Sequence, residues 1–190
     1  MEITRITTSK LRKELLALYF TNPDKSYYLR ELERLLGFSV GNIRRELLRL
    51  EKDGLFERKH VGNLVYYHLN KTYPLFHEMK NIVFRTVGVA GNLKEAIEKI
   101  RGVECGMIYG SFARGEESGI SDVDILIVGD PDMDRLIEVV QKAEQRLKRE
   151  INYTVYNRSE FEKKKRNKDS FILDVLQSPK VFLVGDDQRL

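Results

Sequence analysis

Apolar residues in the first third of the chain recur at helical spacing. They predict a helix over residues 8–20, which ends before the Asn-Pro pair at 22–23. A short amphipathic run, Leu29–Leu36, predicts a second helix that stops at the glycine after it. Ser39 is a suitable N-cap for a third helix. We expect that helix to bury one apolar stripe, made of Val40, Ile43, Leu47 and Leu50.

Two runs of β-favouring residues follow the third helix. Leu55–Arg58 and Leu64–Leu69 predict a hairpin, because residues 59–63 between them form a turn signal. A short helix, a turn, a longer helix and a hairpin make a helix-turn-helix with a wing. Across most of residues 8–73 the sequence, with LRELERLLGFSVGNIRRELLRL at its centre, resembles the ArsR/MarR-like winged-helix regulators. The resemblance implies an N-terminal DNA-binding domain over residues 1–73.

Polar and cationic residues lie off the apolar stripe of the third helix and on the hairpin. The residues that we expect to bind double-stranded DNA are Ser39, Asn42, Arg44, Arg45, Arg49, Arg58 and Lys59. Asparagine and arginine pair with base edges, and cationic side chains also hold phosphates. One recognition helix reads few base pairs, so we expect a homodimer. Two alternatives stay open, namely a solvated basic face and a winged helix that binds protein.

Helical spacing resumes after the hairpin and predicts a connector. Pro74 is placed to begin a helix, and apolar residues continue its pattern. Two glycines interrupt the pattern before it resumes over Leu93–Ile100. We interpret residues 74–101 as a connecting helix and a candidate dimerisation element, which leaves residues 102–190 as the second domain.

The second domain contains a polar motif between two short apolar runs. Residues 104–109 and Ile125–Val128 predict buried strands. Gly110-Ser111 follows the first strand, and ten residues further on Asp122-Val-Asp124 leads into the second. Strand periodicity places Asp122 and Asp124 on one face, with about 6.6 Å between their Cα atoms. Adjacent carboxylates repel unless protons, hydrogen bonds or cations compensate, so the pair predicts a Mg²⁺ site.

The Gly-Ser step has the properties that a triphosphate requires. Gly110 leaves room, Ser111 supplies a hydroxyl beside outward-facing backbone N–H groups, and Arg114 adds positive charge. The order Gly-Ser, ten residues, then Asp-x-Asp, placed between two apolar strands, resembles the motif of the DNA-polymerase-β-like nucleotidyltransferase superfamily. The resemblance covers roughly residues 93–190. The resemblance implies a small mixed α/β sheet flanked by helices, with Mg²⁺ on Asp122 and Asp124. It also implies that the Gly-Ser loop binds the β,γ-phosphates of a nucleoside triphosphate, with in-line displacement at the α-phosphorus and release of pyrophosphate.

The sequence departs from that superfamily at one catalytic position. Its enzymes carry a third carboxylate on a neighbouring strand, which here is predicted over Ile151–Tyr156. The residue most similar in position is Asn152, whose neutral amide cannot act as a base and binds Mg²⁺ more weakly than a carboxylate. Glu150 lies two residues earlier on the same predicted face and is an alternative third ligand. Reduced or lost transfer, with nucleotide binding retained, is therefore one expectation for this domain.

Composition and charge narrow the classes of protein. The 190 residues include 33 Lys and Arg against 29 Asp and Glu, yet residues 1–80 carry a net +5 and residues 81–190 a net −1. This asymmetry fits a polyanion partner for the N-terminal domain. One cysteine excludes an internal disulfide and a cysteine zinc site. Apolar runs are far shorter than the ~20 residues of a membrane span, and no signal peptide is evident, so we expect a cytoplasmic protein.

The patterns together predict an α+β chain, with an N-terminal winged helix-turn-helix and a C-terminal nucleotidyltransferase-like mixed α/β sheet domain. The main hypothesis is a DNA-binding, homodimeric transcriptional regulator whose second domain binds Mg²⁺ and a nucleoside triphosphate. One alternative is an active nucleotidyltransferase that modifies a protein or small-molecule hydroxyl, with the winged helix holding a partner. Another is a non-catalytic interaction module, similar to toxin–antitoxin partners built on the same minimal domain. The basic cluster Lys163–Arg166 is interpreted as a solvated helix face, with phosphate or nucleic-acid contact as its alternative.

Overall fold

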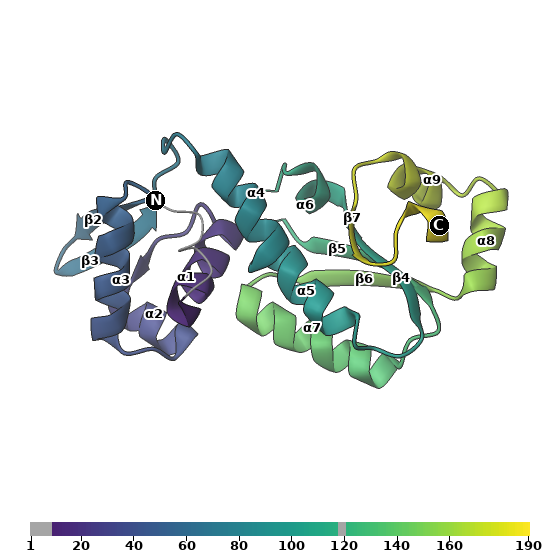
Figure 1. Cartoon of the computed structure of the whole chain (residues 1–190), viewed down its shortest axis with the longest axis horizontal. Helices are drawn as coiled ribbons and strands as arrows, with labels where there is room; N and C mark the ends of the chain where they lie inside the picture. The colour runs from purple at the N-terminus through teal and green to yellow at the C-terminus, as the bar shows by residue number, and fades with distance from the viewer. Residues whose placement is uncertain (1–8, 118–120) are drawn as a thin grey trace. The chain divides into compact units, whose positions relative to one another are not determined.

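The computed structural model describes residues 9–117 and 121–190, which form two compact units (Figure 1). The N-terminal unit spans Met1–Gly88 and the C-terminal unit spans Val89–Leu190. Thr8, expected in the first helix, and residues 118–120, within the Gly-Ser to Asp-x-Asp segment, lie outside the described residues. In the described ranges no helix combines the length and apolar character needed to span a membrane.

The N-terminal unit consists of helices around a small antiparallel sheet with strand order β1-β3-β2. Its elements are α1 (Lys10–Thr21), β1 (Tyr27–Tyr28), α2 (Leu29–Leu36), α3 (Val40–Lys52), β2 (Phe56–Val61), β3 (Leu64–Leu69) and α4 (Phe76–Thr86). The first three helices and the hairpin lie close to their predicted ranges. Strand β1 was not predicted, because its two residues are too few to show a periodic pattern.

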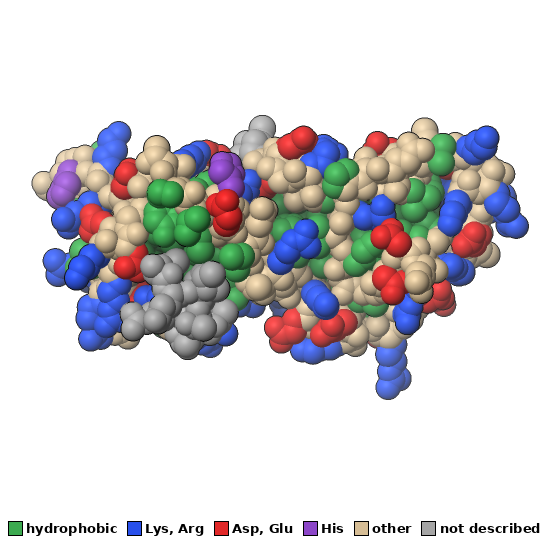
Figure 2. Space-filling view, turned by 45° about the horizontal axis from the view of Figure 1, so that its top comes forward, with side chains coloured by type: hydrophobic (Ala, Val, Ile, Leu, Met, Phe, Trp, Pro, Cys, Tyr) green, Lys and Arg blue, Asp and Glu red, His purple; other side chains and the backbone are tan. Residues whose placement is uncertain are grey.

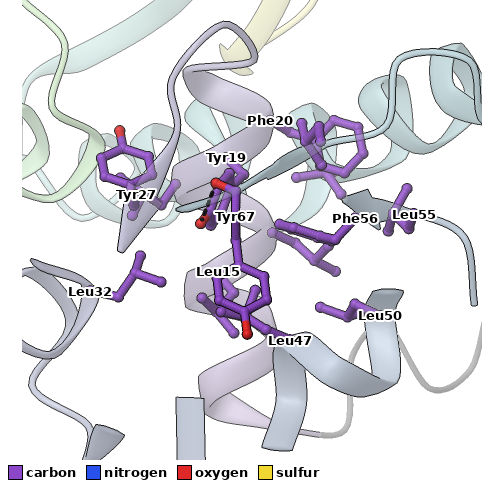
Figure 3. Close-up of a cluster of buried hydrophobic side chains, with 14 of the residues drawn as sticks. Leu15, Tyr19, Phe20, Tyr27, Leu32, Leu47, Leu50, Leu55, Phe56 and Tyr67 are labelled. Carbon is purple, nitrogen blue, oxygen red and sulfur yellow. Dashed lines mark hydrogen bonds between the residues drawn. The ribbon is translucent and has the colours of Figure 1, made fainter. Parts of the chain in front are cut away.

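The core of the N-terminal unit is built around Tyr19 of α1 (Figure 3). The Tyr19 ring makes edge-on contacts with Tyr27, at 5.1 Å between ring centroids, and with Phe56, at 4.7 Å. Its hydroxyl donates a hydrogen bond to the Tyr67 backbone oxygen at 3.1 Å, which satisfies a polar atom inside an apolar cluster. Leucines of α1 and α3 close the rest of the cluster. Helix α1 is therefore the element around which the other helices and the sheet pack.

The start of α3 differs from the sequence expectation. Ser39 occupies the N-cap position, but its side chain makes no capping hydrogen bond. The Val40 N–H donates instead to Glu33 Oε1 of α2, at 3.3 Å. Ile43 of the predicted stripe is fully buried, as are its two leucines, whereas Val40 is half-buried. A carboxylate of the preceding helix thus caps the N-terminus of α3, in place of the serine hydroxyl that the sequence predicted.

The C-terminal unit is a four-stranded mixed sheet, with strand order β6-β5-β4-β7, covered by helices. Its elements are α5 (Val89–Ile97), β4 (Val103–Tyr109), α6 (Gly110–Arg114), β5 (Val123–Gly129), α7 (Met133–Leu147), β6 (Ile151–Tyr156), α8 (Arg158–Arg166), α9 (Ser170–Gln177), β7 (Val181–Val184) and the 3₁₀ turn η2 (Asp187–Arg189). Strands β5 and β6 are parallel and joined through α7, whereas β4 pairs antiparallel with β5 and β7.

Helices cover both faces of this sheet. Alternate residues of the central strands, such as Met107 and Leu126, pack against Phe161 of α8 and against α9. The opposite face meets α5, where Gly106 lies near Ile97, and α5 in turn packs against α7. Helices α7 and α9 lie on opposite sides of the sheet (Figure 1). Because side chains alternate along a strand, residue 124 faces the same side as Leu126, toward α8 and α9.

The predicted connector over residues 74–101 is not a separate element. Helix α4 packs in the N-terminal unit, where Phe76 lies 5.6 Å from Phe20 between ring centroids. Helix α5 packs in the C-terminal unit, and the division falls between Gly88 and Val89. The Gly88 N–H donates to the Val83 backbone oxygen at 2.6 Å, which closes α4 and ends the helical run. The domain boundaries expected at 73 and 101 are therefore replaced by one.

Candidate active site

The two aspartates of the Asp-x-Asp motif lie on one face at the beginning of β5. Asp124 belongs to β5, and Asp122 lies directly before the strand. Val123, between the two aspartates, is fully buried on the other face. Both aspartates are half-buried. In the sheet register Asp124 lies between Tyr109 of β4 and Asn152 of β6. The strand pairing thus sets the residues that surround the acidic pair.

Asn152 lies against both carboxylates. Its Nδ2 donates a hydrogen bond to Asp122 Oδ2 at 3.3 Å. Burial raises the pKa of Asp124, a hydrogen bond from Asn152 opposes that rise, and the negative charge of Asp122 adds to it. Glu150, the alternative third ligand, instead accepts the Val123 N–H through its backbone oxygen at 2.9 Å, and its side chain is exposed. Asn152 therefore occupies the position beside the acidic pair.

The Gly-Ser turn lies directly against Asp124. Gly110 has φ of +71°, in the left-handed region, and begins the short helix α6. A Cβ atom added at Gly110 would lie 2.7 Å from Asp124 Oδ2, closer than atoms approach without displacement. Ser111 follows as the next residue of α6 and is half-buried. Glycine is thus required at this position by both the backbone conformation and the contact with the carboxylate.

Arg114, the cation expected near the Gly-Ser loop, ends α6 and forms an ion pair with Glu116 at 2.7 Å. Its charge also lowers the pKa of Asp124, although less than the hydrogen bond from Asn152 does. The Arg114 side chain is 39% exposed, so it is accessible to a ligand at the loop. Glu116 partly neutralises the positive charge that the sequence assigned to this loop.

Tyr109 is a site residue that the sequence analysis missed. Its ring contacts Phe171 edge-on, at 5.5 Å between centroids. Burial raises the pKa of the Tyr109 hydroxyl, the charge of Asp124 raises it further, and a hydrogen bond with Thr154 opposes the rise. Tyr109 thus links the β4 side of the acidic pair to β6. Its place directly before Gly110 was the available signal in the sequence.

Arg149 is the second residue that the sequence analysis missed. It is only 6% exposed, although it precedes β6 among polar residues. Its Nη1 donates to the Ser121 backbone oxygen at 3.0 Å, and its guanidinium lies 5.7 Å from the centroid of the Phe112 ring. Arg149 therefore joins α6 to the residues that lead into Asp122. No local pattern marks this role, because its contacts come from distant parts of the chain.

Replacing Arg149 with methionine is expected to loosen the site. Methionine keeps much of the side-chain volume but loses the charged hydrogen bond to the Ser121 oxygen, at a cost of about 2 kcal/mol in the free energy of unfolding. Urea denaturation of the full chain, followed by circular dichroism, measures the change. The matched control is Arg101→Met, at an exposed arginine of the same unit, which should change stability by less than about 0.5 kcal/mol. Equal stabilities of the two variants would contradict the role given to Arg149.

The donor atoms at the acidic pair suit a hard divalent cation. Two carboxylates lie side by side against the Asn152 amide, and carboxylate oxygens are ligands that Mg²⁺ prefers. Over residues 9–117 and 121–190 the structure holds no group of three or more His, Cys, Asp and Glu side chains that could bind a metal ion. Within these described ranges the pair has no third acid beside it, and Asn152 occupies that position. The raised pKa of Asp124 reflects negative charge and burial that a cation would offset.

Three comparisons with known proteins found similarities to parts of this chain. Residues 91–177 match the model of the family described as Polymerase beta, Nucleotidyltransferase. Over 58 residues, 30% of this chain, the sequence is 41% identical to a Methanocaldococcus jannaschii protein that carries the provisional name protein adenylyltransferase. That match spans 58% of the relative's length. A crystal structure of a provisionally assigned nucleotidyltransferase from Sulfolobus solfataricus matches with 21% identity and a TM-score of 0.28, over 49% of this chain and 73% of that one.

The C-terminal unit therefore contains a nucleotidyltransferase-like domain with a mixed α/β fold. The resemblance to the DNA-polymerase-β-like superfamily that the sequence predicted for this domain is confirmed by the family match over residues 91–177.

Proposed function

We propose that the chain is a nucleotidyltransferase that transfers a nucleotidyl group from a nucleoside triphosphate to a hydroxyl group of a protein. The observation that carries the proposal is the contact between the Gly-Ser turn and the acidic pair, where a Cβ on Gly110 would meet Asp124 Oδ2 at 2.7 Å. A phosphate-binding turn and a cation site so close together suit one triphosphate bound to both. The name of the Methanocaldococcus jannaschii relative supports a protein as acceptor and favours this hypothesis over a DNA-binding regulator.

Each polar group then has a role. Backbone N–H groups at Gly110 and Ser111, with the Arg114 guanidinium, bind the β- and γ-phosphates. Asp122 and Asp124 are the groups that would hold Mg²⁺, with Asn152 beside them at the third-carboxylate position. When bound, Mg²⁺ supplies charge neutralisation at the phosphates and favours the deprotonated acceptor.

The transfer is an in-line displacement. The acceptor oxygen forms a bond to the α-phosphorus, and the bond from that phosphorus to the oxygen bridging to the β-phosphate breaks. Pyrophosphate leaves with the electron pair of the broken bond. The hydroxyl proton passes to solvent, because the Asn152 amide cannot accept it.

Incubation of the full chain with MgCl₂ and each of the four α-³²P-labelled ribonucleoside triphosphates tests the proposal. Peptides that present serine, threonine or tyrosine serve as acceptors. We expect label on protein or peptide, with pyrophosphate released in equal amount. The absence of both products with all four nucleotides, under conditions where nucleotide binding is measurable, would contradict the proposal.

We propose DNA binding by the N-terminal unit, as a winged helix in a homodimer, as a second candidate function. The outward face of α3 supports it, because Arg44 and Arg45 are exposed. Arg45 bonds to Asn42, while Arg49 pairs with Glu46 at 3.4 Å. The hairpin contributes exposed Lys59, as well as an arginine already paired with an acid of α3. The expected DNA-binding residues therefore include both exposed cations and cations held by acids.

Replacing Arg44 and Arg45 together with alanine is expected to weaken binding of a promoter fragment by about tenfold or more. Each cationic side chain that contacts a phosphate releases a counterion from the DNA, and this release increases the affinity. A gel-shift titration at two salt concentrations measures the affinity and its salt slope, which should both fall. Lys25→Ala with Arg85→Ala, an exposed lysine and arginine elsewhere in the unit, is the control of equal charge. If both double variants bind the fragment with the same affinity, α3 is not part of the DNA interface.

A further inference from the structure

In-line geometry determines the side from which an acceptor reaches the proposed site. The leaving pyrophosphate lies with the Gly-Ser turn, at the end of β4. The acceptor oxygen attacks from the opposite side of the α-phosphorus. The sheet order β6-β5-β4 places β6 beyond the acidic pair on that opposite side. An acceptor therefore approaches over β6.

Strand β6 forms an edge of the sheet and has the chemistry of a pairing surface. Its sequence, Ile151–Tyr156, contains no charged residue and no proline. In the described part of the chain, β5 is the strand that pairs with it. Such an edge is open to a further strand, because charge and proline are the usual devices that block edge pairing.

The outward backbone groups of β6 follow from the register. The Val123 N–H of β5 donates to the Glu150 oxygen at 2.9 Å. In this parallel pairing the even-numbered residues of β6 therefore direct their backbone N–H and C=O groups toward β5. The odd-numbered residues then direct theirs outward. The Ile151 N–H is bonded to Glu144 Oε1 at 2.9 Å, which leaves the groups of Tyr153 and Val155 facing the edge.

A groove continues this surface from the end of β6 onto α8. It has a volume of about 560 Å³ and is lined by Val155, Tyr156, Glu160, Lys163, Lys164, Asn167 and Asp169. Lys164 Nζ lies 2.8 Å from Asp169 Oδ2 and 5.1 Å from the centroid of the Tyr156 ring. Asp169 is thereby neutralised, which leaves Glu160 as the remaining acid of the lining.

Helix α8 carries more positive charge than the acidic side chains of the groove can neutralise. Lys163 and Arg166 are exposed, and among the described residues neither side chain has an ion-pair partner. Lysine and arginine side chains gather over α8 in Figure 2. Lys163 lines the groove together with Val155 and Tyr156 of β6, so its charge lies beside the end of the open edge.

We propose that the β6 edge and the α8 groove bind an extended acidic segment of the acceptor protein. The proposal rests on the function proposed above and adds the class of acceptor. Tyr156 lies four residues beyond Asn152, about 13 Å along the strand. A segment paired with β6 that places its hydroxyl at the acidic pair thus carries its acidic residues about three to six positions away. The open backbone groups of β6 favour a polypeptide over a nucleic acid, because a second strand pairs with them.

Fluorescence anisotropy of labelled peptides on the full chain tests the proposal without requiring catalysis. One peptide carries tyrosine with glutamates three to six positions away, and matched peptides carry glutamine or lysine there. We expect the glutamate peptide to bind about tenfold more tightly than the glutamine peptide. Methylation of alternate backbone nitrogens of the glutamate peptide should remove most of this affinity, because strand pairing needs those N–H groups.

The matched variants locate the surface. Lys163→Glu with Arg166→Glu should weaken binding of the glutamate peptide about tenfold. The control is Lys94→Glu with Arg101→Glu, which makes the same change in charge at two exposed residues, one in α5 and one after it. Because α5 covers the other face of the sheet, this control should change peptide binding less than twofold.

Three results with peptides and oligonucleotides would overturn the proposal. They are equal affinities for the glutamate and glutamine peptides, equal effects of the two double variants, or tighter binding of a single-stranded oligonucleotide that the α8 variant abolishes. A monomer–dimer shift by the α8 variant in sedimentation would overturn it in favour of a second copy. Peptide binding without label transfer would contradict the proposed function while leaving this docking surface supported.

Discussion

Replacing Asp124 with asparagine is expected to reduce transfer of labelled nucleotide by about 10³-fold or more, while the fold remains intact. The carboxylate is one of two charges that would hold the cation, and removing a charge aimed at the transition state costs several orders of magnitude in rate. Burial and the charge of Asp122 both raise the pKa of Asp124, so the structure disfavours the charged form when no cation is bound. Asparagine keeps the shape without the charge. The variant should therefore lose activity without losing stability.

This combination separates a catalytic role from a structural one. Label transfer per unit time and the thermal midpoint of the full chain are the two measurements. Asp130→Asn is the matched control, because Asp130 is exposed directly after β5 and should change neither quantity. A variant at Asp124 that keeps more than about a tenth of the wild-type rate would contradict the assignment of this residue to the cation site. A large fall in thermal midpoint would point to a structural role instead.

The sequence predicted the parts of the site that depend on local spacing. Asp122 and Asp124 share a face because strand periodicity is a local property, and the turn at Gly110 follows directly from the end of a strand. The resemblance to the superfamily placed Asn152 on a neighbouring strand at the third-carboxylate position, and in the structure β6 pairs with β5 so that Asn152 lies opposite Asp124. The predicted roles of these residues in catalysis stay predictions.

Other parts of the site could not be predicted from the sequence. Arg149 reaches the Ser121 oxygen and the Phe112 ring across 28 residues or more of chain. Tyr109 meets Thr154 only because the strands adopt one register. Such contacts depend on tertiary packing, which a hydrophobic pattern does not encode.

The N-terminal unit shows the same limit. The pattern predicted its helices but not the buried ion pair between Arg12 and Glu46, whose side chains are 9% and 7% exposed. Both residues look like ordinary surface charges in a helical pattern, and only the packing of α1 against α3 brings them together. Likewise, the helical spacing through residues 74–101 could not reveal that Gly88 ends one helix and divides the chain.

Replacing Asn152 with aspartate is expected to increase label transfer by up to about 10²-fold. The new carboxylate lies at the position where Nδ2 now bonds to Asp122 Oδ2, so it can accept the acceptor proton and supply a third charged ligand. Without a cation, three carboxylates repel one another, whereas the asparagine amide now donates a hydrogen bond to the pair. We therefore expect a lower thermal midpoint in EDTA and recovery of that midpoint with MgCl₂.

The dependence on MgCl₂ separates the causes of such an increase. A third charged ligand should lower the MgCl₂ concentration that gives half-maximal rate, and Asn152→Ala, which supplies neither charge nor hydrogen bond, should raise it. If the aspartate variant transfers label no faster than wild type, with an unchanged MgCl₂ requirement, then the Asn152 amide does not limit the transfer rate. In that case the acceptor proton is lost by a route that needs no base on β6. If only the MgCl₂ requirement falls, the family's third acid acts here as a ligand rather than as a base.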